Sequence, residues 1–311
     1  MSIWVSSMLS GSEQKEKIYA DKATSMEKIY TKAIDDQDVM LMMNAINIST
    51  NTGIIEGLKT NDRTKVLETL QSIKKRYKNN ALFGNVKIHV HDRNIHSFVR
   101  LWNPEKFGDD LSGFRKSIVA VKETRSPVLA LEVGVTGVEL RGIVPIVSGN
   151  EYVGSVEFMQ GADTIVTALK KKFNLNVIIA LDNRYLETAK ELHDAAKIGS
   201  NLTLATQEKI VDKEFLDELK QTTLDTNTKT FTTNHYYTKV VQLKDFSGNV
   251  VAYAFLGEPL GVLEEQVNES KKVLLRQVVI NSIGGFLILI LLFYVIRIAF
   301  SQVQDNVKTF N

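Results

Sequence analysis

The spacing of apolar residues changes character along the chain. Over residues 13–48 apolar side chains recur every third or fourth position, which predicts a long amphipathic helix. After a polar break at residues 49–53, a second helix is predicted, with Asn61 and Asp62 at its N-terminal cap. At Val86 the period becomes two, which predicts that the helices are followed by strands with one buried face.

The first predicted helix carries a seam with heptad-like spacing. A seam of this kind faces either a partner helix, as in a coiled coil, or the core of its own domain. Both interpretations remain open, because the run is only about three heptads long. The seam consists of Tyr19, Ala23, Met26, Tyr30, Ala33, Gln37 and Met40.

Five strands are predicted after Val86. Two of them precede a break at Pro104 and Gly108, and Asp109 with Asp110 can then cap a short helix that contains Leu111. The next three are joined by short turns, which predicts an antiparallel meander. The predicted strands are residues 86–90, 98–102, 128–133, 138–147 and 152–160.

The second half repeats this pattern in weaker form. A helix at residues 162–173 and a strand at 175–181 are followed by a predicted hairpin at residues 236–256. In both halves the last two strands are joined across a Ser-Gly-Asn turn, at residues 148–150 and 247–249. We therefore predict two related modules in tandem.

A run of residues without charge, 277–296, predicts a transmembrane helix between Arg276 and Arg297. No loop separates it from the preceding helix. The apolar N-terminus is too short to span a bilayer and is interpreted as the remnant of a first membrane helix. The predicted divisions are 1–11 for this remnant, 12–80 for the two helices, 81–172 and 173–258 for the membrane-distal and membrane-proximal modules, 259–276 for a linking helix, 277–296 for the membrane helix and 297–311 for the start of a cytoplasmic segment.

Composition narrows the class of function. The chain has 38 basic and 36 acidic residues without a basic stripe, so nucleic acid is not a predicted partner. It has no cysteine, which excludes disulfides and thiolate metal sites. Because it also has no glycine-rich phosphate loop and no nucleophile elbow, we predict neither an enzyme nor a cofactor.

Charged residues interrupt the strands of the first module where a buried face is expected. Arg100 shares a strand face with Phe98 and Trp102. Arg100 and Trp102 could line a pocket for a small organic anion, because a guanidinium offers paired donors to a carboxylate. In the competing interpretation Arg100 stacks on Trp102 and is paired with Asp109 or Asp110.

Glu132, Arg141 and Glu157 lie on three successive predicted strands. If the turn at residues 134–137 pairs its flanking valines, Arg141 lies diagonal to Glu132 on one face. Whether Glu157 joins them depends on the register of the next turn. The group is either a salt-bridge network that fixes the sheet or the floor of a polar pocket in which Arg141 binds ligand.

His89 and His91 point the same way on one predicted strand, and His96 follows closely. Two histidines at this spacing can ligate zinc, but the sequence assures no third or fourth ligand, so no metal site is predicted. A histidine that donates to a ligand or to a core carboxylate is the preferred interpretation. A metalloprotein built on these three histidines is the alternative from a different functional class, and a passive dimerising scaffold is a third.

Together these features resemble the double Cache (dCache) sensor regions of bacterial methyl-accepting chemotaxis receptors and related membrane sensor kinases. The resemblance covers roughly residues 18–296 and is most specific between residues 86 and 160. It is carried by the long first helix, the final membrane helix, and the pieces Val-Lys-Ile-His-Val-His-Asp ending at Asp92, Arg-Leu-Trp-Asn-Pro from Arg100, Phe-Gly-Asp-Asp-Leu from Phe107, Phe-Arg ending at Arg115, Glu-Val-Gly from Glu132, Leu-Arg-Gly-Ile-Val-Pro from Leu140 and Tyr-Val-Gly-Ser-Val-Glu ending at Glu157.

The resemblance implies an α+β fold with a long N-terminal helix, two tandem PAS/Cache-like antiparallel-sheet modules and one C-terminal transmembrane helix. It also implies a homodimer in the inner membrane, in contact with lipid, with a periplasmic sensor part and a cytoplasmic signalling transmitter as partner. We predict that the chain is the sensory input region of a chemoreceptor that binds a small anionic metabolite, either an organic acid or an amino acid. The alternative is that it is the input region of a sensor kinase or cyclase. The predicted ligand-binding residues are His91, Arg100, Trp102, Arg115, Glu132, Arg141 and Glu157.

Overall fold

The computed structural model describes residues 11–77, 87–225 and 227–309. The predicted membrane-helix remnant at residues 1–11 lies outside this part, apart from Gly11. The helices are α1 (Gly11–Ser49), α2 (Thr52–Thr60), α3 (Arg63–Tyr77), α4 (Lys116–Thr124), α5 (Ala162–Phe173), α6 (Lys213–Gln221) and α7 (Leu260–Thr309). The strands are β1 (Lys87–Asp92), β2 (Ser97–Arg100), β3 (Val128–Gly134), β4 (Gly137–Ser148), β5 (Glu151–Gly161), β6 (Asn176–Asp182), β7 (Lys197–Ile198), β8 (Leu202–Leu204), β9 (Thr230–Thr232), β10 (Tyr236–Lys244) and β11 (Val250–Pro259).

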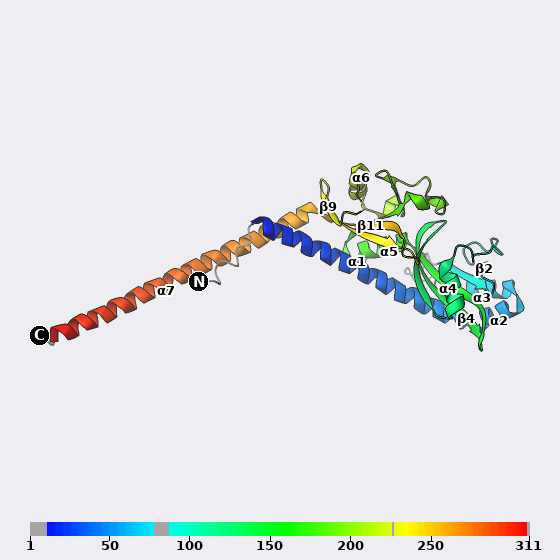
Figure 1. Ribbon diagram of the computed structural model, residues 1–311, viewed down its shortest axis with the longest axis horizontal. Coiled ribbons are helices and arrows are strands. Elements are labelled where there is room, and N and C mark those ends of the chain that lie inside the picture. Colours follow the sequence, from blue (N-terminus) through cyan, green and yellow to red (C-terminus); the bar gives the residue numbers. More distant parts are fainter. Residues whose placement is uncertain (1–10, 78–86, 226, 310–311) are drawn as a thin grey trace. The chain divides into compact units, whose positions relative to one another are not determined.

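The first sheet has five strands in the order β2-β1-β5-β4-β3, and all its pairs are antiparallel (Figure 1). β3, β4 and β5 follow one another through short turns and form the predicted meander. β1 lies on the other side of β5, so β5 is the central strand. The five predicted strands are confirmed, except that Val86 lies outside the described residues.

The second sheet has six strands in the order β7-β8-β6-β11-β10-β9. Apart from β7, this order follows the first sheet strand for strand: β8 corresponds to β2, β6 to β1, β11 to β5, β10 to β4 and β9 to β3. The two hairpins with Ser-Gly-Asn turns, β4–β5 and β10–β11, therefore take equivalent places. The tandem architecture is confirmed, and we call the sheet of β1–β5 with α4 the first module and the sheet of β6–β11 with α6 the second module.

Three helices, rather than the predicted two, precede β1 in the described part of the chain. The extra helix, α2, is capped by the side chain of Asn51, and Asn61 ends it in a left-handed conformation (φ 58°). Asp62 caps α3 as predicted, because its Oδ1 accepts a hydrogen bond from the backbone N–H of Lys65 at 3.0 Å. α2 escaped prediction because nine residues show too little of a helical period.

The segment between β2 and α4 differs from the prediction. The sequence predicts a helix capped by Asp109 and Asp110, but α4 begins only at Lys116. Asp109 is bonded to Arg100, and Asp110 Oδ1 accepts a hydrogen bond from the backbone N–H of Ser112 at 2.8 Å. The predicted cap is wrong, because a guanidinium and a local turn compete more effectively for the two carboxylates.

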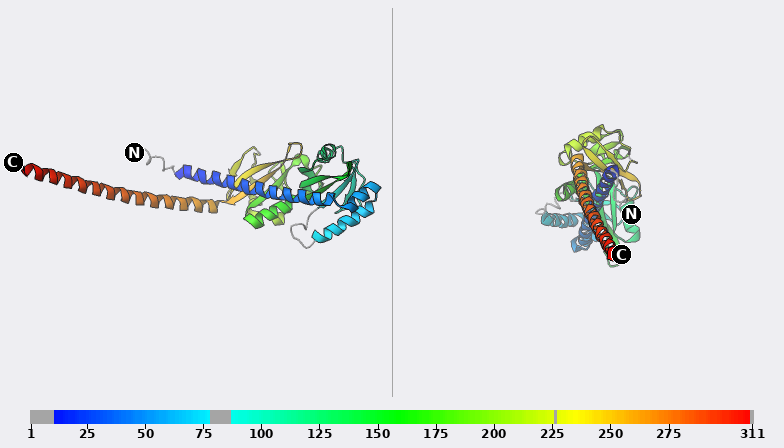
Figure 2. Two further views of the ribbon diagram at one scale, coloured as in Figure 1. Left: turned by 90° about the horizontal axis from the view of Figure 1, so that it is seen from below. Right: turned by 90° about the vertical axis from the view of Figure 1, so that its left-hand side faces the viewer.

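α1 lies along both sheets (Figures 1 and 2). Lys22 on α1 forms an ion pair with Glu258 of β11 at 2.9 Å, and Glu27 pairs with Lys239 of β10 at 3.0 Å. Further along, the backbone of α1 at Leu41 passes so close to Gly142 of β4 that a Cβ there would lie 2.8 Å from a backbone atom. A side chain at this crossing would push the helix off the first sheet.

Three of the seven seam residues of α1 are buried within this chain, and the other four are half-buried. Ala23, Met26 and Tyr30 are at most 6% exposed, and the buried stripe continues at Leu41 and Ala45. The core interpretation of the seam therefore holds for these residues. A different stripe of α1 is exposed, as described below.

The first turns of α1, up to Asp21, group with α7 as a compact unit separate from residues 22–259. Within this unit the side chain of Gln14 donates a hydrogen bond to the hydroxyl of Ser270. The segment Leu260–Ser301 of α7 is long and apolar enough to cross a membrane, and no other helix in the described residues meets that test. As predicted, no loop separates the uncharged run at residues 277–296 from the helical residues before it, because both lie within α7.

Candidate functional site

The register of the first sheet places the predicted charged residues on one face. The predicted pairing across the turn at residues 134–137 is confirmed, so Arg141 lies diagonal to Glu132. Glu157 of β5 lies diagonal to Arg141 on its other side, and it pairs directly with His89 of β1. This face is opposite to the one that α1 crosses, because neighbouring residues on a strand point to opposite faces.

Arg141 is the centre of a buried group of charges. Its Nη1 donates to Glu157 Oε2 at 3.0 Å, and its Nη2 donates to Glu139 Oε2 at 2.6 Å. Its Nε lies 3.5 Å from Glu132 Oε2, so three carboxylates surround one guanidinium. We call the whole group the buried ionic cluster. Its members are Lys87, His89, His91, Arg115, Glu132, Glu139, Arg141 and Glu157.

Arg115 joins the cluster from outside the sheet, at the residue that precedes α4. Its Nε donates to Glu132 Oε2 at 2.9 Å, and its Nη2 donates to Glu157 Oε2 at 2.6 Å. Ser117, in the first turn of α4, donates to Glu132 Oε1 at 2.5 Å. The start of α4 is therefore bound to the sheet through polar contacts as well as through the apolar contacts of Ile118 and Val121.

The charges of the cluster balance. Its three cations are Lys87, Arg115 and Arg141, and its three anions are Glu132, Glu139 and Glu157. Lys87 completes the set by pairing with Glu139 at 2.8 Å. A buried charge without a partner is strongly destabilising, so this balance is what allows the Glu157 side chain to be fully buried.

The protonation states follow from burial and from the arginines. Burial alone would raise the pKa of Glu157, but the charges of Arg115 and Arg141 hold this pKa well below its ordinary value. Burial is also the main reason that the pKa of His89 falls to about 3 and that the pKa of His91 is lowered. At physiological pH both imidazoles are therefore neutral and Glu157 is ionised.

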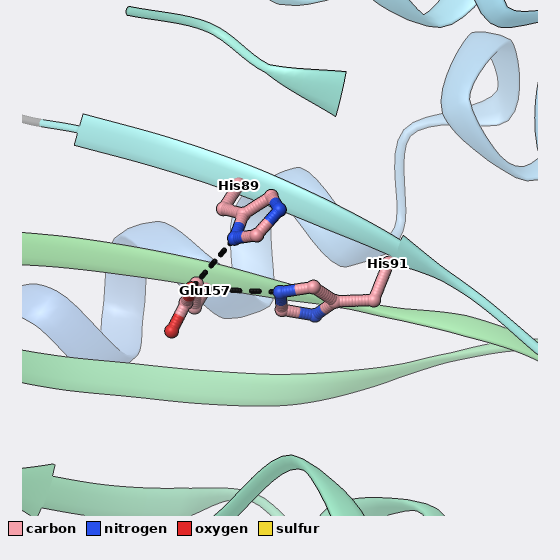
Figure 3. Close-up of side chains that lie close together, drawn as sticks. All are labelled: His89, His91 and Glu157. Atoms are coloured by element: carbon pink, nitrogen blue, oxygen red, sulfur yellow. Dashed lines mark hydrogen bonds and ion pairs between the residues drawn. The ribbon is translucent and has the colours of Figure 1, made fainter. Parts of the chain in front are cut away.

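The two imidazoles approach Glu157 through its other carboxylate oxygen (Figure 3). His89 Nδ1 lies 2.9 Å and His91 Nε2 lies 3.4 Å from Glu157 Oε1. The remaining ring nitrogens contact serine hydroxyls, His89 Nε2 at 2.8 Å from Ser97 Oγ and His91 Nδ1 at 2.9 Å from Ser155 Oγ. The preferred interpretation, a histidine beside a core carboxylate, describes this contact.

Arg100 and Trp102 lie beside the cluster. Arg100 is bonded to Asp109 through both of its terminal nitrogens, at 2.7 and 2.6 Å, and also donates to the carbonyl of Lys106. Trp102 contacts His89 edge-on, with ring centroids 5.6 Å apart. Of the two interpretations of Arg100, pairing with Asp109 is therefore the arrangement observed, and the aromatic neighbour of Trp102 is His89.

The structure brings five of the seven predicted ligand residues together and adds others. His96, named with His89 and His91 as a possible zinc ligand, instead pairs with Asp92 at 3.1 Å. Glu139 was missed, although its place two residues before Arg141 puts it on the same strand face. Ser117 had no comparable signal, because its contact depends on where α4 packs.

The cluster reaches two cavities between the modules. A cavity of about 250 Å³ is lined by Phe114, Arg115, Lys116 and Glu132 of the first module and by the β10–β11 turn, including Asp245, of the second. A larger cavity of about 780 Å³ is lined in part by Lys87 of the cluster and by the neighbouring Trp102. Of the predicted ligand-binding residues, Arg115 and Glu132 line the smaller cavity and Trp102 lines the larger one. The ligand-binding roles of the predicted residues stay a prediction.

Glu157→Gln is expected to destabilise the fold strongly, because it leaves Arg115 and Arg141 with an uncompensated buried charge. We expect a loss of roughly 3–5 kcal/mol, or a melting temperature lower by roughly 6–20 °C, measured by thermal unfolding of the full chain in detergent. Glu151→Gln is the matched control on the same strand. Its exposed ion pair with Arg93 should matter by no more than about 1 kcal/mol, and equal losses in the two variants would contradict the account.

One comparison, with models of known protein families, agrees with the tandem architecture. The model of the family dCache_3, described as "Double sensory domain of two-component sensor kinase", matches residues 19–261. No curated protein matches the chain in sequence.

Solved sensor domains are similar at low identity. The Vibrio cholerae histidine kinase DctB sensor domain is 10% identical, with 79% of this chain and 98% of that chain covered and a TM-score of 0.48. The periplasmic domain of V. cholerae LuxQ is 10% identical, with coverages of 77% and 99% and a TM-score of 0.46. The ligand-binding domain of the Campylobacter jejuni chemoreceptor Tlp3, solved with L-valine, is 11% identical, with coverages of 81% and 98% and a TM-score of 0.43.

Similarity at this level says nothing about a shared ligand. The family model, in contrast, covers most of the chain and includes both modules. The chain therefore belongs to the dCache_3 family of double sensory domains, which are sensor regions rather than enzymes.

Proposed function

We propose that this chain is the extracytoplasmic input region of a membrane signalling receptor and that it binds a small carboxylate-bearing metabolite. The observation that carries the proposal is the edge of the buried ionic cluster at Arg115 and Glu132, which lines the cavity of about 250 Å³. Charged groups fixed in place beside a cavity suit ligand recognition, because their orientation is already set before the ligand arrives.

The lining of this cavity supports the chemical class. Arg115 and Lys116 supply positive charge for a carboxylate, whereas Glu132 and Asp245 supply negative charge for an ammonium group. The aromatic ring of Phe114 adds apolar surface. The volume is slightly below the roughly 300–1,000 Å³ of cavities for drug-sized ligands, which favours a molecule of the size of an amino acid or a short organic acid.

A ligand in this cavity would touch both modules at once. The second-module side is the turn that joins β10 to β11, at residues 245–249. β11 ends at Pro259 and α7 begins at Leu260, so no loop separates the turn's strand from the apolar helix. A ligand that binds two arrangements of this turn with different affinity would shift the population of those arrangements, and this shift is the signal.

Family membership and the apolar segment of α7 support the remaining parts of the proposal. α7 anchors the chain in the inner membrane in contact with lipid, the modules lie on the periplasmic side, and a cytoplasmic transmitter receives the signal. The sequence favours a chemoreceptor as the whole protein. The family is described as the double sensory domain of a two-component sensor kinase, which makes a kinase input the second candidate.

We also propose that the receptor is a homodimer formed through α1. Val39, Met43 and Ile46 form an exposed apolar stripe on this helix, with 59%, 65% and 44% of their surfaces accessible. Their spacing of four and three residues puts them on one side of the helix. This stripe is distinct from the seam that is buried within the chain.

The first prediction tests the ligand site. In a thermal-shift screen of organic and amino acids on the full chain in detergent, at least one compound should raise the melting temperature. Lys116→Ala should weaken its binding about tenfold, the equivalent of one charged contact of about 1.4 kcal/mol. Lys122→Ala, on the same helix but outside the cavity lining, should bind as the unchanged protein does. No hit, or equal binding by both variants, would refute the site.

The second prediction concerns the dimer. Met43→Glu places a charge in the exposed stripe and should weaken dimerisation about tenfold or more, as measured by analytical ultracentrifugation in detergent. Thr31→Glu is the control at an exposed position of α1 outside the stripe. A monomeric wild-type chain, or dimerisation unchanged by Met43→Glu, would show that α1 is not the interface.

A further inference from the structure

Two imidazoles and a carboxylate of the first module converge on one point (Figure 3). His89 Nδ1 lies 2.9 Å and His91 Nε2 lies 3.4 Å from Glu157 Oε1, and the possible ligand atoms of the three residues all lie within 4.8 Å of one another. Ligands held about 2.0–2.1 Å from a tetrahedral Zn²⁺ are about 3.3 Å from each other. The observed separations bracket this value, so small side-chain shifts would complete the geometry.

We propose that His89, His91 and Glu157 bind one divalent transition-metal ion, with Zn²⁺, Cu²⁺ and Ni²⁺ as the suitable ions. Imidazole nitrogen suits these ions, whereas Mg²⁺ and Ca²⁺ select oxygen ligands. The sequence suggested no third ligand because Glu157 lies 66 residues after His91 in the chain and reaches it only through the pairing of β1 with β5. This site does not rest on the proposed metabolite cavity, which is lined by other residues.

His91 provides an observation that is independent of the spacing. Its side chain is fully buried, and its Nε2 makes no hydrogen bond although it points toward Glu157. Its nearest polar neighbour is Glu157 Oε1 at 3.4 Å, and a buried polar atom that makes no hydrogen bond is destabilising. Coordination to a metal ion would use the lone pair of this nitrogen.

The surroundings of the three ligands allow them to bind an ion without losing a proton to solvent. The outer ring nitrogens contact the hydroxyls of Ser97 and Ser155, and a hydroxyl can either donate or accept. Without an ion, the ring N–H groups face Glu157 and the serines donate to the outer nitrogens. With an ion, each ring proton is on the outer nitrogen, and the serine hydroxyl oxygen accepts a hydrogen bond from that N–H group. Such a hydrogen bond is the usual way to orient a histidine ligand.

The two carboxylate oxygens of Glu157 have different neighbours. Its Oε2 accepts hydrogen bonds from Arg115 and Arg141 at 2.6 and 3.0 Å, which fixes the carboxylate in place. Its Oε1 faces the two imidazoles, accepts a longer hydrogen bond from Arg115 Nη1 at 3.3 Å, and is the atom that would bind the ion. Because the charges of the cluster already balance, the ion adds positive charge, and we expect micromolar rather than tighter binding. Three protein ligands also leave one coordination position for water or an anion.

A second group of possible ligands provides the control. Glu214, Glu218 and His235 also lie within reach of one another, but Glu214 and His235 are exposed. Exposed groups of this composition commonly bind no ion, so this group carries no proposal. It does contain His235, one of the five histidines of the chain. Replacing His235 shows whether the ion binds in the first module or at this second group.

Trp102 offers a direct readout, because its ring lies 5.6 Å from that of His89. The chain has two tryptophans, so Trp4→Phe leaves Trp102 as the only one. The test titrates this full chain, without a histidine tag and after treatment with a chelator, with Cu²⁺ in detergent. Trp102 fluorescence should be quenched with saturation at one ion per chain, and a large excess of Zn²⁺ should reverse the quenching by competition, because Cu²⁺ binds the same ligands more tightly. Elemental analysis after dialysis against Zn²⁺ should give one zinc per chain.

The variants locate the ion. His91→Asn lacks Nε2 and should weaken quenching at least about tenfold, since even changes behind the ligands reduce metal affinity 10–100-fold. His235→Asn should bind as the parent does. Absence of quenching in the parent, or quenching that is unchanged in His91→Asn or lost in His235→Asn, would overturn the proposal. If His91→Asn fails to fold by circular dichroism, the parent titration and the zinc content decide.

Discussion

The first module depends on one buried carboxylate. Glu157 occupies the central strand of the sheet, and its side chain has no solvent exposure. It is stable there because two guanidinium groups compensate its charge, one from the neighbouring strand β4 and one from the residue before α4. The positions of β4 and α4 are therefore linked through Glu157, so a shift of either element would leave a buried charge without its partner.

This constraint gives the cluster a structural role, and we propose a ligand-binding role for part of it. The competing interpretations, a network that fixes the sheet or a pocket floor, apply to different parts of it. Arg141 is enclosed by three carboxylates, which is the arrangement of a fixed scaffold. Arg115 and Glu132 belong to the same network but also line a cavity, so in the proposed function they are the members that would contact a ligand.

The strands, the tandem modules and the continuous final helix could be predicted from the sequence, because each rests on local periodicity or on a repeated turn. The diagonal pairing of Arg141 with Glu132 could also be predicted, since a two-residue period and one short turn determine it. The contact of His89 with Glu157 could not, because it requires β1 to return beside β5 across a long connection. The false helix cap at Asp109 has a different origin: the sequence offered Asp109 both as a helix cap and as a partner of Arg100, and the pairing is the arrangement that forms.

We propose that ligand binding at the first module changes the second module through the turn between β10 and β11. Hydrogen–deuterium exchange of the full chain in detergent, with and without the most stabilising acid, distinguishes this coupling from a change within the first module alone. We expect slower exchange in two separate segments at once, residues 114–117 and residues 245–251. Slower exchange confined to the first module, with the β10–β11 turn unchanged, would contradict it.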